Sequence, residues 1–365
     1  MQSKVSIVKC LDYDQVLIYE AVKRSVDLIG GMNKFVQPGQ KVLIKPNLLK
    51  IGKPEDAVVT HTEVIRAVIR LVKEITPHIF VGDSPAGFIK AEAVYEKCGI
   101  TRLCEEEKVN LVKFDRIETI EGIPFTSLKN EVDVCISLPK FKTHNLTTIT
   151  AGIKNVFGLI PGLYKVQCHK DAPNFKVFSK EIAKIYKLAS AQLTIVDSVL
   201  AMEGDGPAAG TPRKLGLVLA SADAVAMDAV LAKIVGLEPF DIISTKEAFH
   251  LGLGEADIKK INIVGEALKS VEVKDFKLPK IFAVYKAPNS IIKWLFKIIP
   301  LVMGVDYKNC TNCMMCQKIC PQQAIAEING KLKVDFRKCI LCLCCSEICP
   351  NNAIYMRFFN WRVRS

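Results

Sequence analysis

The chain has 365 residues, of which 50% are hydrophobic, so it can bury a large core and is expected to form one big domain and a smaller one. Its formal net charge is +12, but no helix-turn-helix, zinc-finger or RNP-like pattern accompanies this charge, which argues against nucleic acid as a partner. The excess positive charge instead favours an acidic small molecule, a protein partner or a membrane surface.

The first 270 residues alternate short apolar strands with helices. One helix is predicted over 16–29, and a second begins after Thr60 and Glu63, which have the spacing of a capping box. A third, almost wholly apolar helix is predicted over 222–235. Continuous apolar strands between helices are typical of a parallel or mixed sheet covered on both faces, so we predict an α/β fold for residues 1–270. The strands are expected over 4–8, 41–47, 79–81, 111–114, 132–138, 193–196, 215–219 and 261–264.

Polar side chains follow the predicted strands where each strand ends. Ligands of open α/β sheets bind outside the carboxyl ends of the strands, so these positions form a candidate site, although any single one is as well explained as a surface or capping residue. The carboxylates among them suit a hard cation, but turn formation is the favoured explanation. The set is Lys45, Asn47, Asp83, Ser84, Lys140, Lys142, His144, Asp197, Glu203 and Asp205.

Residues 143–158 concentrate hydroxyl groups, glycines and basic side chains. Lys154 and Asn155 lie near a predicted helix start, where backbone N–H donors and the helix dipole favour an anion. The G-x4-G-K-[ST] spacing of a Walker motif is missing, and no G-x-G-x-x-G follows a strand, so a nicotinamide or flavin Rossmann site has little support.

These positions together predict a site for a small anionic substrate or cofactor. Lysine and amide side chains would bind the anion, and His144 is the expected proton donor, with Lys142 beside it as a second catalytic residue. The expected binding residues are Lys45, Asn47, Asp83, Ser84, Lys140, Lys154 and Asn155.

Residues 271–304 have a different pattern and are interpreted as a linker. Within it, 290–303 combine large apolar side chains with Lys293 and Lys297, which predicts an amphipathic helix that is too short and too charged to span a bilayer. Such a helix can pack against the α/β domain or lie on a membrane surface. The basic, aromatic tail at 357–365 has the same two interpretations.

Residues 305–356 contain the run C-x2-C-x2-C-x3-C-P twice. This run is the signature of bacterial two-cluster ferredoxins, in which the fourth cysteine of each run binds the cluster of the other run. We therefore expect a small ferredoxin-like domain with two [4Fe-4S] clusters. The first cluster has the expected ligands Cys310, Cys313, Cys316 and Cys349, and the second has Cys339, Cys342, Cys345 and Cys320.

The two runs resemble each other beyond their cysteines, because 349–354 repeats the pattern of 320–325, and this indicates an internal duplication. Between them, Asn329-Gly330 predicts the turn of a type I′ β-hairpin. A zinc ribbon would pair C-x2-C units across a longer gap, and a disulfide framework would need an oxidising compartment, so both alternatives are disfavoured. Cys344 is interpreted as a spare thiol between ligands.

Six cysteines lie outside the two ligand sets and show no pairing pattern. Scattered reduced thiols beside iron–sulfur ligands indicate a reducing cytoplasm. Residues 1–12 also lack the apolar core of a signal peptide, which agrees with a cytoplasmic location. The six are Cys10, Cys98, Cys104, Cys135, Cys168 and Cys344.

Four short phrases precede the cysteine runs: K-P-N-L at 45–48, G-D-S-P at 82–85, P-K-F-K-T-H at 139–144 and G-I-K-N-V-F-G at 152–158. Their order, followed by two ferredoxin runs, resembles the iron–sulfur proteins named for a domain of unknown function, number 362 in that series. The resemblance covers roughly residues 35–265 and the cysteine runs. It implies a redox role and provides neither a substrate nor a catalytic residue.

The sequence thus predicts an oxidoreductase in which two clusters pass electrons to a small anionic substrate or cofactor at the α/β domain, with a ferredoxin or reductase as redox partner. The alternative is a ferredoxin-like electron carrier whose α/β domain docks partner proteins and catalyses nothing. An exposed cluster face would favour the carrier, whereas a deep polar pocket near the clusters would favour the enzyme.

Overall fold

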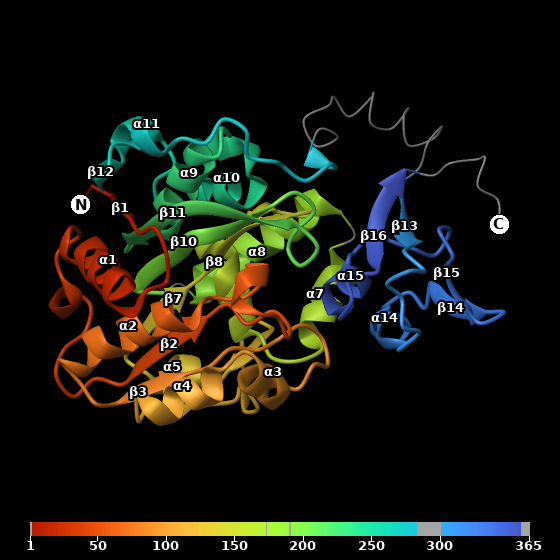
Figure 1. Cartoon of the computed structure of the whole chain (residues 1–365), viewed down its shortest axis with the longest axis horizontal. Helices are drawn as coiled ribbons and strands as arrows, with labels where there is room; N and C mark the ends of the chain where they lie inside the picture. The colour runs from red at the N-terminus through yellow and green to blue at the C-terminus, as the bar shows by residue number, and fades with distance from the viewer. Residues whose placement is uncertain (1, 173, 190, 283–300, 359–365) are drawn as a thin grey trace.

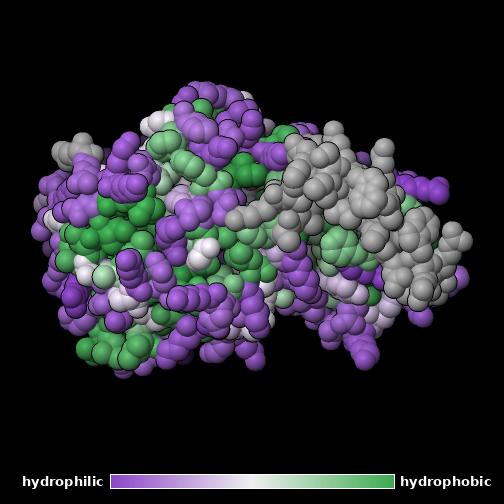
Figure 2. Space-filling model, turned by 90° about the horizontal axis from the view of Figure 1, so that it is seen from above, coloured by the Kyte–Doolittle hydropathy of each residue, from purple (hydrophilic) through white to green (hydrophobic). Residues whose placement is uncertain are grey.

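The computed structural model describes residues 2–172, 174–189, 191–282 and 301–358. These residues form a large α/β part and a smaller part at one end of the molecule, in which the last described segment folds (Figure 1). Seen from above, hydrophilic residues cover much of the visible face, with apolar patches between them (Figure 2). Within the described ranges, no helix has both the length and the apolar content needed to cross a bilayer.

The α/β part is built on a ten-stranded mixed sheet with the strand order β12-β1-β11-β10-β7-β2-β3-β4, while β8 pairs with β10 and β9. The pairs along β10-β7-β2-β3-β4 are parallel, whereas β11 runs antiparallel to both β1 and β10. The predicted α/β fold is therefore confirmed. The strands are β1 (Lys4–Lys9), β2 (Val42–Pro46), β3 (Ile79–Val81), β4 (Asn110–Leu111), β7 (Val134–Leu138), β8 (Lys140–His144), β9 (Thr148–Thr150), β10 (Leu193–Glu203), β11 (Thr211–Ser221) and β12 (Asn262–Gly265).

Helices cover both faces of this sheet, because successive strand side chains point to opposite sides. In β2, Val42 and Ile44 pack into one buried core and Leu43 into the other. The first core contains side chains of α1 (Gln15–Asp27), α2 (Thr62–Lys73), α3 (Ala91–Lys97) and α4 (Ile100–Glu106). The second contains side chains of α6 (Gly152–Asn155), α8 (Phe175–Ala189), α9 (Ala224–Ile234) and α10 (Ile243–His250).

Local sequence explains where the main helices begin. The Asp14 carboxylate accepts hydrogen bonds from the first backbone N–H groups of α1, and Asp223 does the same for α9. The second helix departs from the prediction, because His61 is the N-cap of α2 in place of Thr60. The Thr60 hydroxyl instead donates to the carbonyl of Leu138 at 2.6 Å and accepts from the amide of Asn47. The Thr60 hydroxyl is therefore bonded to neighbouring segments of the fold and does not cap α2.

Several short elements complete the α/β part. The hairpin of β5 (Ile117–Ile120) and β6 (Ile123–Thr126) and the helix α7 (Tyr164–Asp171) were not predicted from the sequence. The others are α5 (Leu128–Glu131), α11 (Leu268–Val271) and the 3-10 turns η1 (Met32–Lys34), η2 (Pro54–Asp56), η3 (Val156–Leu159), η4 (Pro239–Asp241) and η5 (Ile258–Lys260).

The small part contains two antiparallel strand pairs and two short helices. β14 (Ile325–Ile328) and β15 (Lys331–Val334) form the predicted hairpin, whose turn residues Asn329 and Gly330 both have positive φ. β13 (Leu301–Val305) pairs with β16 (Ile354–Phe358), and α14 (Met315–Ile319) contacts α15 (Cys344–Ile348). The predicted helix at 290–303 lies mainly outside the described residues, and its last residues, 301–303, belong to β13. Most of the predicted tail, 359–365, also lies outside them.

Candidate functional site

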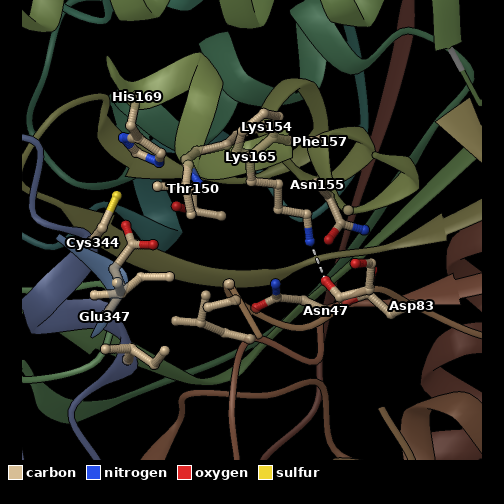
Figure 3. A pocket seen from close by; sticks show the side chains of 18 of the residues that line it. Asn47, Asp83, Thr150, Lys154, Asn155, Phe157, Lys165, His169, Cys344 and Glu347 are labelled. Atoms are coloured by element: carbon tan, nitrogen blue, oxygen red, sulfur yellow. Dashed lines mark hydrogen bonds between the residues drawn. The ribbon is translucent and has the colours of Figure 1, made fainter. Parts of the chain in front are cut away.

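A pocket lies where the small part meets the strand ends of the α/β part. It encloses a cavity of about 50 Å³. Side chains from the α/β part face Cys344 and Glu347 of α15 across it (Figure 3). The lining residues are Lys45, Asn47, Leu49, Asp83, Ser84, Ala86, Gly87, Thr150, Lys154, Asn155, Phe157, Gly158, Lys165, Val166, His169, Ile319, Cys344, Glu347 and Ile348.

The floor of the pocket is a buried ion pair between the ends of two neighbouring strands. β2 and β3 are parallel, so their carboxyl ends meet, and Lys45 Nζ lies 2.7 Å from Asp83 Oδ1 with both side chains buried. The other carboxylate oxygen of Asp83 accepts from the amide of Leu48 at 2.7 Å. The Lys45 amine also donates to the carbonyl of Pro46. This pair therefore holds the loop after β2 against the end of β3.

Gly158 allows η3 to pass directly over this ion pair. A Cβ at this position would lie 2.2 Å from Asp83 Oδ1 and 2.5 Å from Lys45 Nζ, closer than any side chain can approach. Asn155, one turn earlier, donates to the Ser137 hydroxyl at 2.8 Å. The close packing of residues 152–158 against the strand ends thus explains the Gly158 and Asn155 of the G-I-K-N-V-F-G segment.

The sequence suggested that the start of α6 could bind an external anion, but a carboxylate of the protein itself already binds there. Asp228 of α9 accepts hydrogen bonds from the amide of Gly152 at 2.7 Å and of Ile153 at 3.3 Å, the first residues of α6. Burial raises the pKa of the Asp228 carboxyl to about 7, although these two hydrogen bonds oppose the shift. The amides at the start of α6 are therefore not available to a ligand in the pocket.

Lys154 is a cation of the pocket that no carboxylate contacts directly among the described residues, although the charges of Glu347 and Asp83 oppose the effect of burial on its pKa. In the part of the chain that the structure describes, its amine forms no hydrogen bond or ion pair, and it lies 5.5 Å from the centre of the Phe157 ring. Burial lowers the pKa of the Lys154 ammonium. An ammonium in such surroundings is costly unless an anion accompanies it.

Two further polar residues of the pocket, Lys165 and His169, come from α7 and were not among the predicted site residues. Lys165 donates to the backbone carbonyls of Ser84 and Pro85, and burial lowers the pKa of its ammonium to about 7. The His169 ring stacks on Phe178 at 4.3 Å, and its Nδ1 has no hydrogen-bond partner among the described residues. Burial lowers the pKa of His169 to about 4, so the ring is neutral at pH 7. Nothing in the sequence distinguishes them from surface residues.

The small part closes the pocket with α14 and α15, which supply Ile319, Cys344, Glu347 and Ile348. Glu347 Oε1 lies 3.3 Å from His144 Nε2, outside hydrogen-bond geometry. Gly87 makes the close packing possible, since a Cβ there would lie 2.5 Å from the Ile319 side chain. The contact brings together segments that are far apart in the sequence.

Three predicted residues lie behind the pocket instead of lining it. Lys140 pairs with Asp197 at 2.8 Å in the interior, and Lys142 donates to the carbonyl of Val58 at 2.7 Å. The Nδ1 atom of His144 accepts from the amides of Leu146 and Thr147, and burial lowers the pKa of this ring to about 3. The predicted residues that do line the pocket are Lys45, Asn47, Asp83, Ser84, Lys154 and Asn155. Catalytic roles for Lys142 and His144 stay predictions.

The carboxylates considered for a hard cation are not gathered into one site. Asp83 pairs with Lys45, and Asp197 pairs with Lys140. In the described ranges, no group of three or more His, Cys, Asp or Glu side chains is arranged to hold a single metal ion.

The cysteines of the small part have the surroundings that a [4Fe-4S] cluster needs. Cys320, Cys339, Cys342 and Cys345 line one small cavity together with apolar side chains such as Met303 and Leu343. Burial raises the pKa of the Cys316 thiol to about 11, and the nearby Cys349 and Cys313 contribute to this rise. Each predicted ligand set therefore contains cysteines that are neighbours in space.

The backbone around these cysteines also fits a cluster. Left-handed residues recur at equivalent places, Asn312 and Met314 in the first run and Leu341 and Leu343 in the second. Such turns direct backbone N–H groups towards one centre, as anion-binding and iron–sulfur sites require. The amides of Ala324 and Ala353 donate to the sulfurs of Cys320 and Cys349, both at 3.2 Å.

Comparison with known proteins gives two family matches and one curated relative. Residues 42–233 match a domain of unknown function, DUF362, and residues 302–350 match a 4Fe-4S dicluster domain. The thylakoid-associated protein sll1697 of Synechocystis is 32% identical over 288 residues, which cover 77% of this chain and 89% of that protein.

Similar solved structures include the lactate racemase apoprotein of Thermoanaerobacterium thermosaccharolyticum, with a TM-score of 0.37 and 12% identity over 61% of this chain. A structural-genomics protein of Thermotoga maritima has a TM-score of 0.35 and 16% identity over 65% of this chain. This chain covers 55% and 58% of those two proteins, respectively. The family match over residues 42–233 and the 32% identical relative show that the chain belongs to the DUF362 family, and it carries a 4Fe-4S dicluster domain.

Proposed function

We propose that this protein is an oxidoreductase that holds two [4Fe-4S] clusters and binds a small oxyanion or carboxylate in the pocket between its two parts. The first cluster takes Cys310, Cys313, Cys316 and Cys349 as ligands, and the second takes Cys339, Cys342, Cys345 and Cys320. When bound, the clusters supply or accept single electrons.

The unpaired ammonium of Lys154 is the observation that carries the anion site. Lys45 pairs with Asp83, and Lys165 donates to two carbonyl groups, but the Lys154 amine forms no hydrogen bond or ion pair among the described residues, and the buried Glu347 carboxylate acts on it only from a distance. The Thr150 hydroxyl, also in the lining, is buried without a hydrogen-bond partner among the described residues. An anion would satisfy both groups at once.

The size of the cavity limits the ligand. A water-sized molecule needs roughly 10–15 Å³ of such volume, so a cavity of about 50 Å³ has room for about four non-hydrogen atoms or waters. This suits an ion of the size of acetate, nitrite or hydrogencarbonate. A nucleotide or a flavin is too large.

Lys165 is the best-placed proton donor in the pocket. The pKa of its ammonium is lowered to about 7, near the value at which a general acid works best at neutral pH. Its two carbonyl contacts use two of its three N–H groups and leave one for the ligand. His169 contributes a neutral ring to the wall, which orients the ligand without adding charge.

A second candidate function is an electron carrier that docks redox proteins such as a ferredoxin or a reductase. The exposed side chain of Cys313 supports it, because a partner could approach a cluster from that side. The curated relative is called thylakoid-associated, so a membrane-surface contact of this chain is a further proposal.

Isothermal titration calorimetry of the anaerobically purified protein with acetate, hydrogencarbonate and nitrite tests the anion site. The wild type and the Lys170→Met variant, which loses an exposed lysine of α7, are expected to bind at least one of these ions equally well. Lys154→Met is expected to bind it at least tenfold more weakly. Equal binding by Lys154→Met and the wild type would contradict the proposed anion site. The carrier function would then be preferred.

A further inference from the structure

The Lys50 side chain of the α/β part extends into the small part and donates a hydrogen bond to the backbone of one predicted cluster ligand. Its amine donates to the carbonyl oxygen of Cys349 at 2.7 Å and to the Asn352 side-chain oxygen at 2.6 Å. The side chain is 4% exposed. In the described part of the chain, no carboxylate forms a direct ion pair with this buried amine, and the charges of Glu347 and Asp56 act on it from farther away.

The internal duplication provides a comparison within the same molecule. Cys320 is the counterpart of Cys349, and both sulfurs accept from a backbone amide four residues later at 3.2 Å. The turn residues Gln323 and Asn352 are also alike, with φ of 50° and 51°. The carbonyl of Cys320 accepts from the Gln323 amide, and no lysine side chain donates to it among the described residues. The Cys349 half is thus contacted by a lysine of the α/β part, and the Cys320 half has no such contact among the described residues.

We infer that Lys50 raises the reduction potential of the cluster bound through Cys349 above that of the cluster bound through Cys320. This inference rests on the proposed occupancy of both cysteine sets, but it does not depend on the pocket ligand. Lys50 is a tuning residue and touches no substrate.

Two physical effects act in the same direction. Reduction adds a negative charge to the cluster, and a buried ammonium nearby stabilises that charge more strongly than an exposed one, because less water screens it. The hydrogen bond to the Cys349 carbonyl also withdraws electron density from the ligand residue. Net charge and hydrogen bonding at the ligands are among the features that set iron–sulfur potentials.

The position of Lys50 links this effect to the pocket. Lys50 directly follows Leu49, which lines the pocket, on the loop that the Lys45–Asp83 pair anchors. Lys50 thus lies where the α/β part meets the cluster part. Its charge favours reduction of the cluster bound through Cys349.

Redox titration followed by EPR, on protein purified without oxygen, tests the inference. Lys50→Met removes the charge and keeps most of the length, and Lys50→Arg keeps the charge. Lys318→Met removes an exposed lysine of α14 as the matched control. The Cys313→Ser variant alters the ligand set of Cys349 only, so it identifies which signal belongs to that set. Iron content is measured for every variant, which separates loss of a cluster from a change in its potential.

The expected result is that Lys50→Met lowers the midpoint potential of the Cys349 cluster and leaves the other nearly unchanged, while Lys50→Arg and Lys318→Met resemble the wild type. If Lys50→Met loses iron, the Asn352→Asp variant tests the inference in its place. The new carboxylate would offset the Lys50 charge, so it should lower the midpoint potential of the Cys349 cluster. Unchanged potentials, equal shifts of both clusters, or the same shift in Lys50→Arg as in Lys50→Met would overturn the inference.

Discussion

The Lys45 amine and the Asp83 carboxylate lie 2.7 Å apart at the adjoining ends of β2 and β3, and both side chains are almost fully buried. Removing either partner leaves the other charge uncompensated in the interior, which typically costs about 3–5 kcal/mol. We expect Lys45→Met and Asp83→Asn each to lower the urea midpoint of unfolding strongly. The double variant should lose less than the sum of the two single variants, and strict additivity would show that the two charges are not coupled.

Gly158→Ala tests the close approach of η3 to this pair. The added methyl group would meet Asp83 Oδ1 and Lys45 Nζ at 2.2 and 2.5 Å, so the turn must move away. Overpacking of this kind usually costs about 1–3 kcal/mol. We expect a lower thermal midpoint and weaker anion binding by calorimetry.

Gly122→Asn is the matched control for Gly158→Ala. Gly122 lies in the turn between β5 and β6, and a Cβ there would meet nothing within 4 Å. Its positive φ is one that Asn tolerates. A Gly158→Ala variant as stable as this control would contradict the described packing.

Asp228 predicts a pH dependence of stability. Its pKa is raised from 3.8 to about 7 in the folded protein, so between these values the folded state holds a proton that the unfolded state releases. The stability linked to this proton is complete below about pH 4 and is lost as the pH rises to about 7, by a few kcal/mol in total.

The Asp228→Asn variant separates this effect from other titrating groups. Its side-chain oxygen can still accept from Gly152, but it carries no titrating proton. We expect urea unfolding at pH 5 and pH 7 to show a larger loss of stability for the wild type than for the variant. The same pH dependence in both proteins would mean that Asp228 is ionised in the fold.

Lys165 predicts a pH dependence of anion binding. Burial lowers the pKa of its ammonium to about 7, while the charges of Asp83 and Glu347 oppose the shift and those of Lys45 and Lys154 add to it. We expect the affinity for the bound anion to fall as the pH rises from 6 to 8. Lys165→Met should bind more weakly at pH 6 and show little change over this range, so a dependence that persists in this variant would exclude Lys165 as its source.

Much of the architecture followed from the sequence because it is encoded in local patterns. The apolar runs of β2 and β3 predicted strands, and the rule that ligands bind at strand ends singled out Lys45 and Asp83. Lys154 was singled out by its polar, glycine-containing segment, and the structure places all three in one pocket. The hairpin at Asn329-Gly330 followed from its turn residues.

Other features depend on contacts that no local pattern reveals. The Thr60 hydroxyl is satisfied by a strand carbonyl, so it does not cap α2. Lys165 and His169 enter the pocket because α7 packs over the strand ends. Glu347 reaches it only because the cysteine-rich part docks there. Lys142 and His144 belong to the strand β8, which the sequence did not predict, and their side chains are buried in the interior.

The measurement that tests the central proposal most directly is the EPR spectrum of the dithionite-reduced protein, with iron and sulfide content, before and after saturation with the anion that binds by calorimetry. About eight irons for each chain, signals of two [4Fe-4S] clusters and a change of the signals on anion binding are predicted. Four irons or fewer, or two cluster signals that none of the tested anions alters, would contradict an anion site at the cluster-bearing wall.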